Sequence, residues 1–146
     1  MNRSFSILVL LLLITSTSVY AKDKTRFGGQ VGFPLYTVVF MQVPLSDQSL
    51  IQLEVGSLLG ISTILGAKYR RQFSADNSRS FWEIGAFNTD AFSFLGINIP
   101  SGTVAQISVN TYLSKGEHGG WVASMIGLSG SGGTRLVPNI SYEYVF

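Results

Sequence analysis

The stretch NISYEYVF, residues 139–146, decides the fold that the sequence predicts. Successive side chains of a β-strand point to opposite faces, so this stretch has two unlike faces. The apolar and aromatic face consists of Ile140, Tyr142, Tyr144 and Phe146. The other face is mostly polar and includes Glu143, a pattern that fits a strand of a closed barrel in lipid, where one face meets acyl chains and the other a polar lumen.

The same ending resembles the terminal strand of bacterial outer-membrane β-barrel proteins, which typically end in Phe after alternating aromatic and apolar residues. Tyr142, Tyr144 and Phe146 match that pattern. The resemblance implies that the outer-membrane assembly machinery reads this strand, so these three residues are the candidate assembly signal. The motif is short, and the rest of the sequence has to support it.

The first residues have the pattern of an export signal. Asn2 and Arg3 precede an apolar run over residues 5–14, and small residues then lead to Ala21. A basic start, a short apolar run and a small residue at the cleavage site are typical of a signal peptide. The run is shorter than the roughly 20 residues of a membrane-spanning helix, so an uncleaved anchor is the weaker alternative. We expect a signal peptide over residues 1–21 and one mature domain over residues 22–146.

The composition excludes several classes of protein. The chain has no Cys, so an exported domain of this size relies on packing and backbone hydrogen bonds rather than on disulfides. The formal net charge is only +2, and the pair Arg70-Arg71 is too small a basic cluster for a nucleic-acid site. Charged residues make up only 12% of the chain, which fits a barrel with one lipid-facing side.

Turn signals divide the mature chain into eight expected strands, over residues 26–33, 36–44, 50–57, 62–72, 80–88, 103–113, 121–128 and 134–146. Their lengths are near the 9–11 residues of a tilted membrane strand, and their number is even, as in bacterial single-chain barrels. The predicted fold is all-β, a transmembrane antiparallel up-and-down β-barrel. A soluble sandwich or lipocalin-like barrel has similar spacing.

The distribution of charge favours the membrane barrel. The expected outward faces carry almost no charge, and Arg71 is the exception. The opposite faces carry a set of acids and bases that we expect to pair as a network in the lumen, because unpaired buried charges are costly. This set comprises Arg26, Glu54, Lys68, Arg70, Glu83, Arg135 and Glu143.

Aromatic residues cluster near the expected strand ends, which resembles the interfacial girdles of membrane barrels. They are Tyr69, Trp82, Trp121, Tyr142, Tyr144 and Phe146. Ordinary core aromatics are the alternative interpretation. Two features do not fit a regular eight-stranded barrel easily. The first is Pro138, which falls inside the last strand and marks a bulge or the limit of pairing. Within the long connection over residues 89–102, the segment over residues 91–99 is also apolar enough to be a strand rather than a loop.

The sequence offers little chemistry. His118 is the sole histidine, beside Glu117 on a Gly-rich turn, and no Gly-x-Ser-x-Gly elbow accompanies it. One His and no Cys make a metal site unexpected, and we expect no catalytic residue and no cofactor. A lipid A-modifying outer-membrane enzyme and a soluble periplasmic lipocalin-like barrel that binds an apolar ligand remain the alternatives.

Eight strands leave an interior that side chains fill, so general diffusion through a pore is not expected, although a thin water or proton path remains open. We therefore predict an outer-membrane location in a Gram-negative envelope, a lumen plugged by polar side chains, and a structural or interaction role. The expected partners are outer-membrane lipid and the assembly machinery. An extracellular partner at the apolar connection over residues 89–102 is a further hypothesis, since loops on rigid scaffolds often carry binding.

Overall fold

The computed structural model describes residues 25–33, 36–58, 62–76, 78–94, 97–99 and 101–146. The expected signal peptide over residues 1–21 lies outside this part of the chain. Within the described part, no helix is long and apolar enough to cross a membrane.

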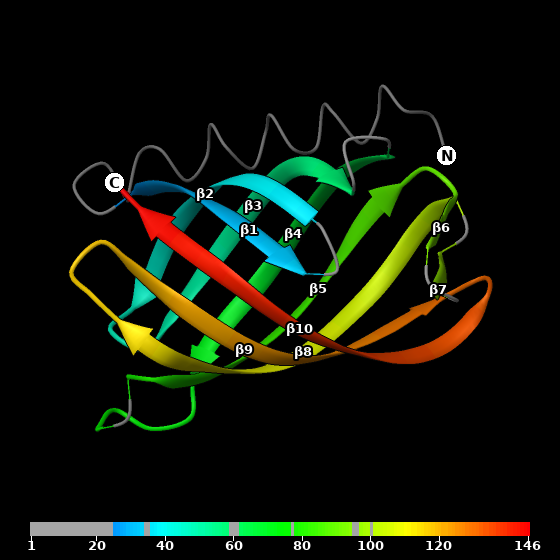
Figure 1. The fold of residues 1–146 in the computed structure, drawn as a ribbon. Helices are drawn as coiled ribbons and strands as arrows, with labels where there is room; N and C mark the ends of the chain where they lie inside the picture. Colours follow the sequence, from blue (N-terminus) through cyan, green and yellow to red (C-terminus); the bar gives the residue numbers. More distant parts are fainter. Residues whose placement is uncertain (1–24, 34–35, 59–61, 77, 95–96, 100) are drawn as a thin grey trace.

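Eight strands form one closed barrel, in the order β1-β10-β9-β8-β5-β4-β3-β2, and every neighbouring pair is antiparallel (Figure 1). The all-β, up-and-down barrel that the sequence predicts is therefore confirmed. The strands of the described residues are β1 (Arg26–Phe33), β2 (Tyr36–Ser46), β3 (Ser49–Leu58), β4 (Ser62–Gln72), β5 (Ser80–Thr89), β6 (Phe92–Phe94), β7 (Ile97–Ile99), β8 (Gly102–Lys115), β9 (Gly119–Gly130) and β10 (Gly133–Val145).

The C-terminal stretch closes the barrel. In the antiparallel pair of β1 and β10, Val31 lies opposite Tyr142, and Gln30 lies opposite Glu143. The contact continues past the strand, where the backbone N–H of Phe146 donates to the carbonyl oxygen of Phe27 at 2.7 Å. Closure removes the open edges that would otherwise pair with other chains.

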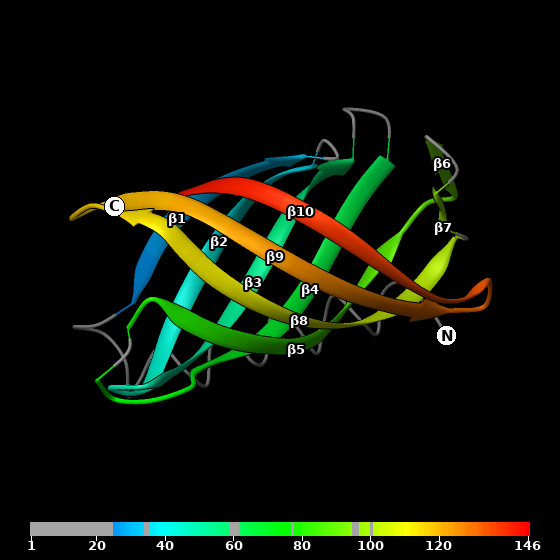
Figure 2. The same cartoon turned by 60° about the horizontal axis from the view of Figure 1, so that its bottom comes forward.

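The barrel has two unlike ends. At one, which we call the terminus end, β1 begins, the C-terminus lies, and the β2–β3, β4–β5 and β8–β9 connections turn (Figures 1 and 2). At the other, the far end, the β5–β8 connection contains the small separate hairpin of β6 and β7. The apolar connection is thus neither a plain loop nor a barrel strand.

The two faces of each strand differ as alternation predicts. Large apolar side chains on the outer wall are at least half exposed, and they include Phe27, Val31, Val39, Val55, Ile84, Ile107, Val109 and Ile140. The inward positions include five buried charged residues, described below. The wall is thus apolar outside while charges lie inside, the reverse of a soluble barrel.

Pro138 lies in β10 without breaking the sheet. Alternate β10 residues direct their backbone nitrogens towards β1, and the bond from Phe146 to Phe27 shows that Pro138 belongs to this set. However, β1 ends at Phe33, which pairs with Ile140, so Pro138 lies beyond the last residue of β1. The missing N–H therefore removes no ladder hydrogen bond, and Pro138 marks the limit of pairing with β1.

Candidate functional site

A bidentate ion pair crosses the lumen. Arg70 of β4 and Glu143 of β10 come from strands on opposite sides of the barrel order. Arg70 Nη2 lies 2.7 Å from Glu143 Oε2, and Nη1 donates to Oε1 at 3.0 Å. This fork-to-fork geometry is the strongest that a guanidinium and a carboxylate form, and it holds the two walls at a fixed distance.

Three more charged residues extend this pair along neighbouring strands. Arg70 Nε donates to Glu83 Oε1 of β5 at 2.8 Å, and Lys68 Nζ lies 2.8 Å from Glu54 Oε2 of β3. Lys68 Nζ also lies 3.9 Å from the second oxygen of Glu83. All five residues are buried, and we call Glu54, Lys68, Arg70, Glu83 and Glu143 the charge cluster.

The cluster holds three acids and two bases, so neutral donors have to complete it. The hydroxyl of Tyr112 donates to Glu143 Oε1 at 2.8 Å, and that of Ser108 donates to Glu83 Oε2 at 3.2 Å. Gln52 donates to Glu54 Oε2 at 3.1 Å. These bonds replace the water that each carboxylate loses on burial, which would otherwise cost several kcal/mol per ion.

A ring also contacts the cluster. The guanidinium carbon of Arg70 lies 4.3 Å from the centroid of the Phe81 ring, a cation–π geometry. The ring covers a face of the guanidinium that has no hydrogen-bond donors. Arg70 is therefore fixed by two carboxylates in its plane and an aromatic ring above it.

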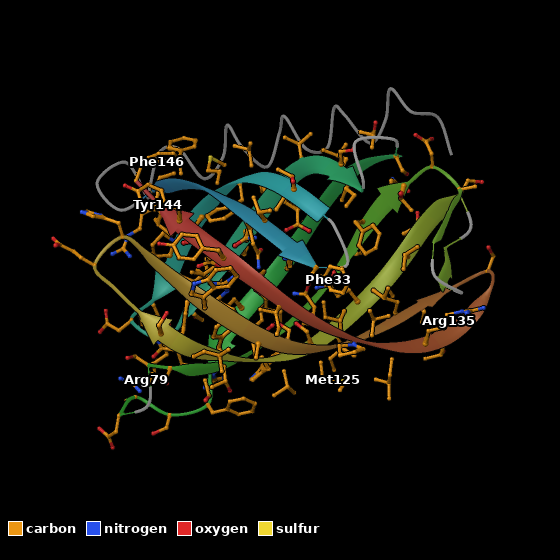
Figure 3. The ribbon with its side chains drawn as sticks, viewed as in Figure 1. Phe33, Arg79, Met125, Arg135, Tyr144 and Phe146 are labelled. Carbon is orange, nitrogen blue, oxygen red and sulfur yellow. The ribbon has the colours of Figure 1, made fainter. Side chains whose placement is uncertain are left out.

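The structure does not bring Arg26 and Arg135 into the charge cluster, although the sequence predicts both in one network. Arg26 is the first residue of β1 and lies exposed at the rim of the terminus end. Arg135 lies exposed near the β9–β10 turn at the far end (Figure 3). Alternation places a residue on a face, but its height along the barrel depends on where its strand begins.

An apolar layer fills the lumen on the far side of the cluster, and sequence reasoning missed it. It consists of Val38, Phe40, Ile64, Phe87 and Val104, all buried. Glycines on the neighbouring strands are the sequence signal that indicates this layer. A Cβ on Gly28 would lie 2.5 Å from the Phe40 ring, and one on Gly66 would lie 2.7 Å from Phe87 Cβ. Both glycines make room for a large ring on the neighbouring strand.

A cavity of about 960 Å³ opens at the terminus end, and its lining includes Arg70 and Glu143 of the charge cluster. We call this cavity the vestibule. Its walls include Arg26, Gln42, Gln72, Tyr112, Lys115 and Glu143. Polar and apolar side chains both line the vestibule, which ends where Arg70 and Glu143 meet.

His118 lies at the rim of the vestibule and is largely exposed. Its Nε2 is 4.0 Å from Glu117 Oε1, which is beyond hydrogen-bond distance, and both side chains are exposed on a turn. Among the described residues, no three His, Cys, Asp or Glu side chains gather as a metal site would require. No contact in this turn fixes His118 as a general base, and the described residues form no metal-binding cluster.

The aromatic residues of the predicted girdle lie on the outer wall towards the terminus end. They meet in pairs: Tyr69 with Trp82 at 5.4 Å, Trp121 with Tyr142 at 5.4 Å, and Tyr144 with Phe146 at 5.2 Å between ring centroids. Tyr144 and Phe146 lie together beside the C-terminus (Figure 3). Amphipathic rings at this level are what the boundary between lipid and water favours.

No protein-family model matches the sequence, and no curated protein matches it either. Among solved structures, the chain is similar to the N-terminal β-barrel domain of OprF from Pseudomonas aeruginosa, with 14% identity and a TM-score of 0.55. The match covers 84% of this chain and 95% of that domain. At this identity the likeness shows the fold alone, and at that level the resemblance to small eight-stranded bacterial outer-membrane β-barrels is confirmed.

Proposed function

We propose that the mature chain is a small outer-membrane β-barrel of a Gram-negative envelope, with a structural or interaction role and no catalysis. The observation that carries this proposal is the inversion of the barrel wall. Apolar side chains such as Ile107 and Val109 are more than half exposed outside, whereas Lys68, Glu83 and Glu143 are buried inside. In water this arrangement would expose a large apolar surface, which favours aggregation, whereas lipid covers it.

The same inversion disfavours the soluble lipocalin-like alternative. A barrel that binds an apolar ligand needs an apolar cavity, whereas the vestibule ends on the buried ion pair of Arg70 and Glu143. The predicted export signal, the closed barrel without free edges and the apolar outer wall together fit the outer membrane. In the orientation that the class implies, the terminus end faces the periplasm.

A plugged lumen is part of the proposal. The charge cluster spans the barrel through Arg70 and Glu143, and the apolar layer lies behind it. Eight strands enclose only enough space for side chains, so two successive layers are sufficient to close it. This supports a wall protein rather than a channel.

Catalysis on lipid A is less well supported. His118 is on the β8–β9 turn at the terminus end, which in the proposed orientation is remote from the outer leaflet. Its exposed position and long contact with Glu117 give it no preorganised partner. Replacement of His118 by Ala is expected to leave lipid A unchanged in mass.

We also propose that Tyr142, Tyr144 and Phe146 form the assembly signal. Their rings are exposed on the outer face of the barrel at β10, so they are accessible to a partner before β1 and β10 pair.

The β6–β7 hairpin is a second proposed contact point. Its register places Phe92 opposite Ile99 and Phe94 opposite Ile97. Deletion of residues 91–99 should leave the barrel folded and abolish binding of an extracellular partner.

Gel mobility and membrane flotation test the main proposal. The mature chain should migrate differently in unheated and boiled detergent samples, because a membrane barrel stays folded in the unheated one. It should also float with outer-membrane fractions in a density gradient. A single unshifted band in the soluble fraction would contradict the proposal.

A further inference from the structure

Among the described residues of β4, Arg71 is a charged side chain on the outer wall of the barrel. It is exposed near the end of β4, and its outward direction follows from the inward direction of Arg70 and Gln72. Within the described part of the chain, the ion pairs do not include Arg71. A free cation on such a wall is stable only near the water boundary, where an anion can reach it.

The surroundings of Arg71 mark that boundary. Its neighbour across β5 is Trp82, and Trp82 packs against Tyr69 at 5.4 Å between ring centroids. Its neighbour across β3 is Ser49. Arg71 thus lies at the same height on the barrel as this aromatic pair. In the proposed membrane placement, lipid headgroups lie at this height.

A shallow pocket of about 380 Å³ lies beside Arg71 and is formed by the β2–β3 turn. Its other walls are Ser46, Asp47, Gln48 and Ser49. The hydroxyl oxygens of Ser46 and Ser49 are 2.7 Å apart, so one donates to the other and the second hydrogen remains free to donate outward. The pocket therefore offers a guanidinium and a hydroxyl donor to an anion, and the Asp47 carboxylate to a cation.

From this geometry we propose that the pocket binds the headgroup of a zwitterionic glycerophospholipid of the phosphatidylethanolamine type. Arg71 and the serine pair hold the phosphate, and Asp47 holds the ammonium group. Arginine matches phosphate with parallel donors, which a lysine or an amide does not reproduce. The acyl chains then extend along the outer wall, over Leu65 and Val55 of β4 and β3. The inference rests on the proposed membrane placement.

Charge complementarity selects this lipid over an anionic one. Phosphatidylglycerol presents the same phosphate but no ammonium group, so Asp47 would face it as a like charge. The wild-type protein should therefore retain phosphatidylethanolamine in preference to phosphatidylglycerol. Replacement of Asp47 by Asn should remove the preference while leaving phosphate binding in place.

The test is lipid retention by the mature barrel, measured by native mass spectrometry after release from nanodiscs that contain both lipids in equal amounts. We expect Arg71→Gln to reduce retention of both lipids by roughly tenfold, the loss expected for a charge-assisted hydrogen-bond pair. Asp47→Asn should bring the two lipids to equal retention. Arg79→Gln, which removes a cation from the β4–β5 turn at the same end of the barrel, is the matched control and should behave as wild type (Figure 3).

The outcomes separate the site from the membrane placement. Gel mobility with and without boiling first shows that each variant is folded in the membrane. A folded Arg71→Gln barrel that retains lipid within twofold of wild type overturns the site and leaves the placement standing. Binding of soluble glycerophosphoethanolamine as tightly as the intact lipid would overturn the assignment to a lipid. A wild-type chain that does not insert overturns both the placement and the site.

Discussion

The half of the lumen nearer the chain termini contains the charge cluster, whereas the half nearer the far end contains the apolar layer. On β4, Ile64 belongs to the apolar layer and Arg70 to the charge cluster, and on β5 Phe87 and Glu83 divide in the same way. The charge cluster is directional and needs every partner, because a buried carboxylate without its base is costly. The apolar layer is held by shape alone. The two halves should therefore fail differently when a single residue changes.

The largest effect is expected in the charge cluster. Replacement of Arg70 by Ala leaves the carboxylates of Glu83 and Glu143 buried without their shared base. Breaking a buried pair from one side costs about 3–5 kcal/mol, so the urea midpoint of the folded barrel in detergent should fall strongly. If Arg70→Ala shifts the midpoint no more than an exposed substitution does, the charge cluster does not depend on its ion pairs as we describe.

A double replacement sharpens the same point. In Arg70→Met combined with Glu143→Leu, one base and one acid leave together, and apolar groups of similar size take their place. Such swaps recover much of the single-residue loss, because they remove the uncompensated charge. We expect the double variant to be more stable than Arg70→Ala by at least about 1.4 kcal/mol, a tenfold change in the unfolding equilibrium. A double variant no more stable than Arg70→Ala would contradict this, and urea unfolding of both variants decides it.

The glycines under the rings should show a smaller, steric effect. A methyl group at Gly28 would overlap both the Phe40 ring and a backbone oxygen of Tyr144, so Gly28→Ala should destabilise the barrel by about 1–3 kcal/mol. Gly29 is the matched control on the other face of β1, since its added Cβ meets only an ordinary contact with the Val38 carbonyl oxygen at 3.6 Å. Equal losses for both substitutions would show that backbone entropy, rather than the ring, sets the cost.

The smallest effect is expected for a conservative change in the apolar layer. Replacement of Ile64 by Val removes one methylene from a buried side chain, for which about 0.5–1.5 kcal/mol is typical. The neighbouring side chains can partly close the gap, which the charge cluster cannot do. A loss as large as that of Arg70→Ala would remove the distinction between the two halves.

Much of this fold could be predicted from the sequence because alternation is local information. The stripe that ends at Phe146 and the clean patterns of β3 and β4 were enough to predict a closed barrel with a polar lumen face. The axial position of a residue is not local, since it depends on strand register. Arg26 and Arg135 therefore lie on the same strand face as Glu143, but at different positions along the barrel axis.

The apolar layer escaped prediction for a related reason. Residues 38–41 of β2 are apolar on both faces, so the sequence does not show which side enters the lumen. The partner strands decide it: Gly28, Gly56 and Gly66 leave the space that Phe40 and its neighbours occupy. Pairs of glycine and aromatic residues on adjacent strands are visible only after the strands have been aligned.

Ion conductance tests the central account most directly, because that account is a membrane barrel whose lumen is closed by two layers of side chains. The mature chain would be refolded into planar bilayers, with insertion verified by protection from an added protease. We predict a conductance indistinguishable from that of a protein-free bilayer, since the ion pair of Arg70 and Glu143 and the apolar layer block the path in series. Stable conductance steps from the inserted wild-type protein would contradict the account.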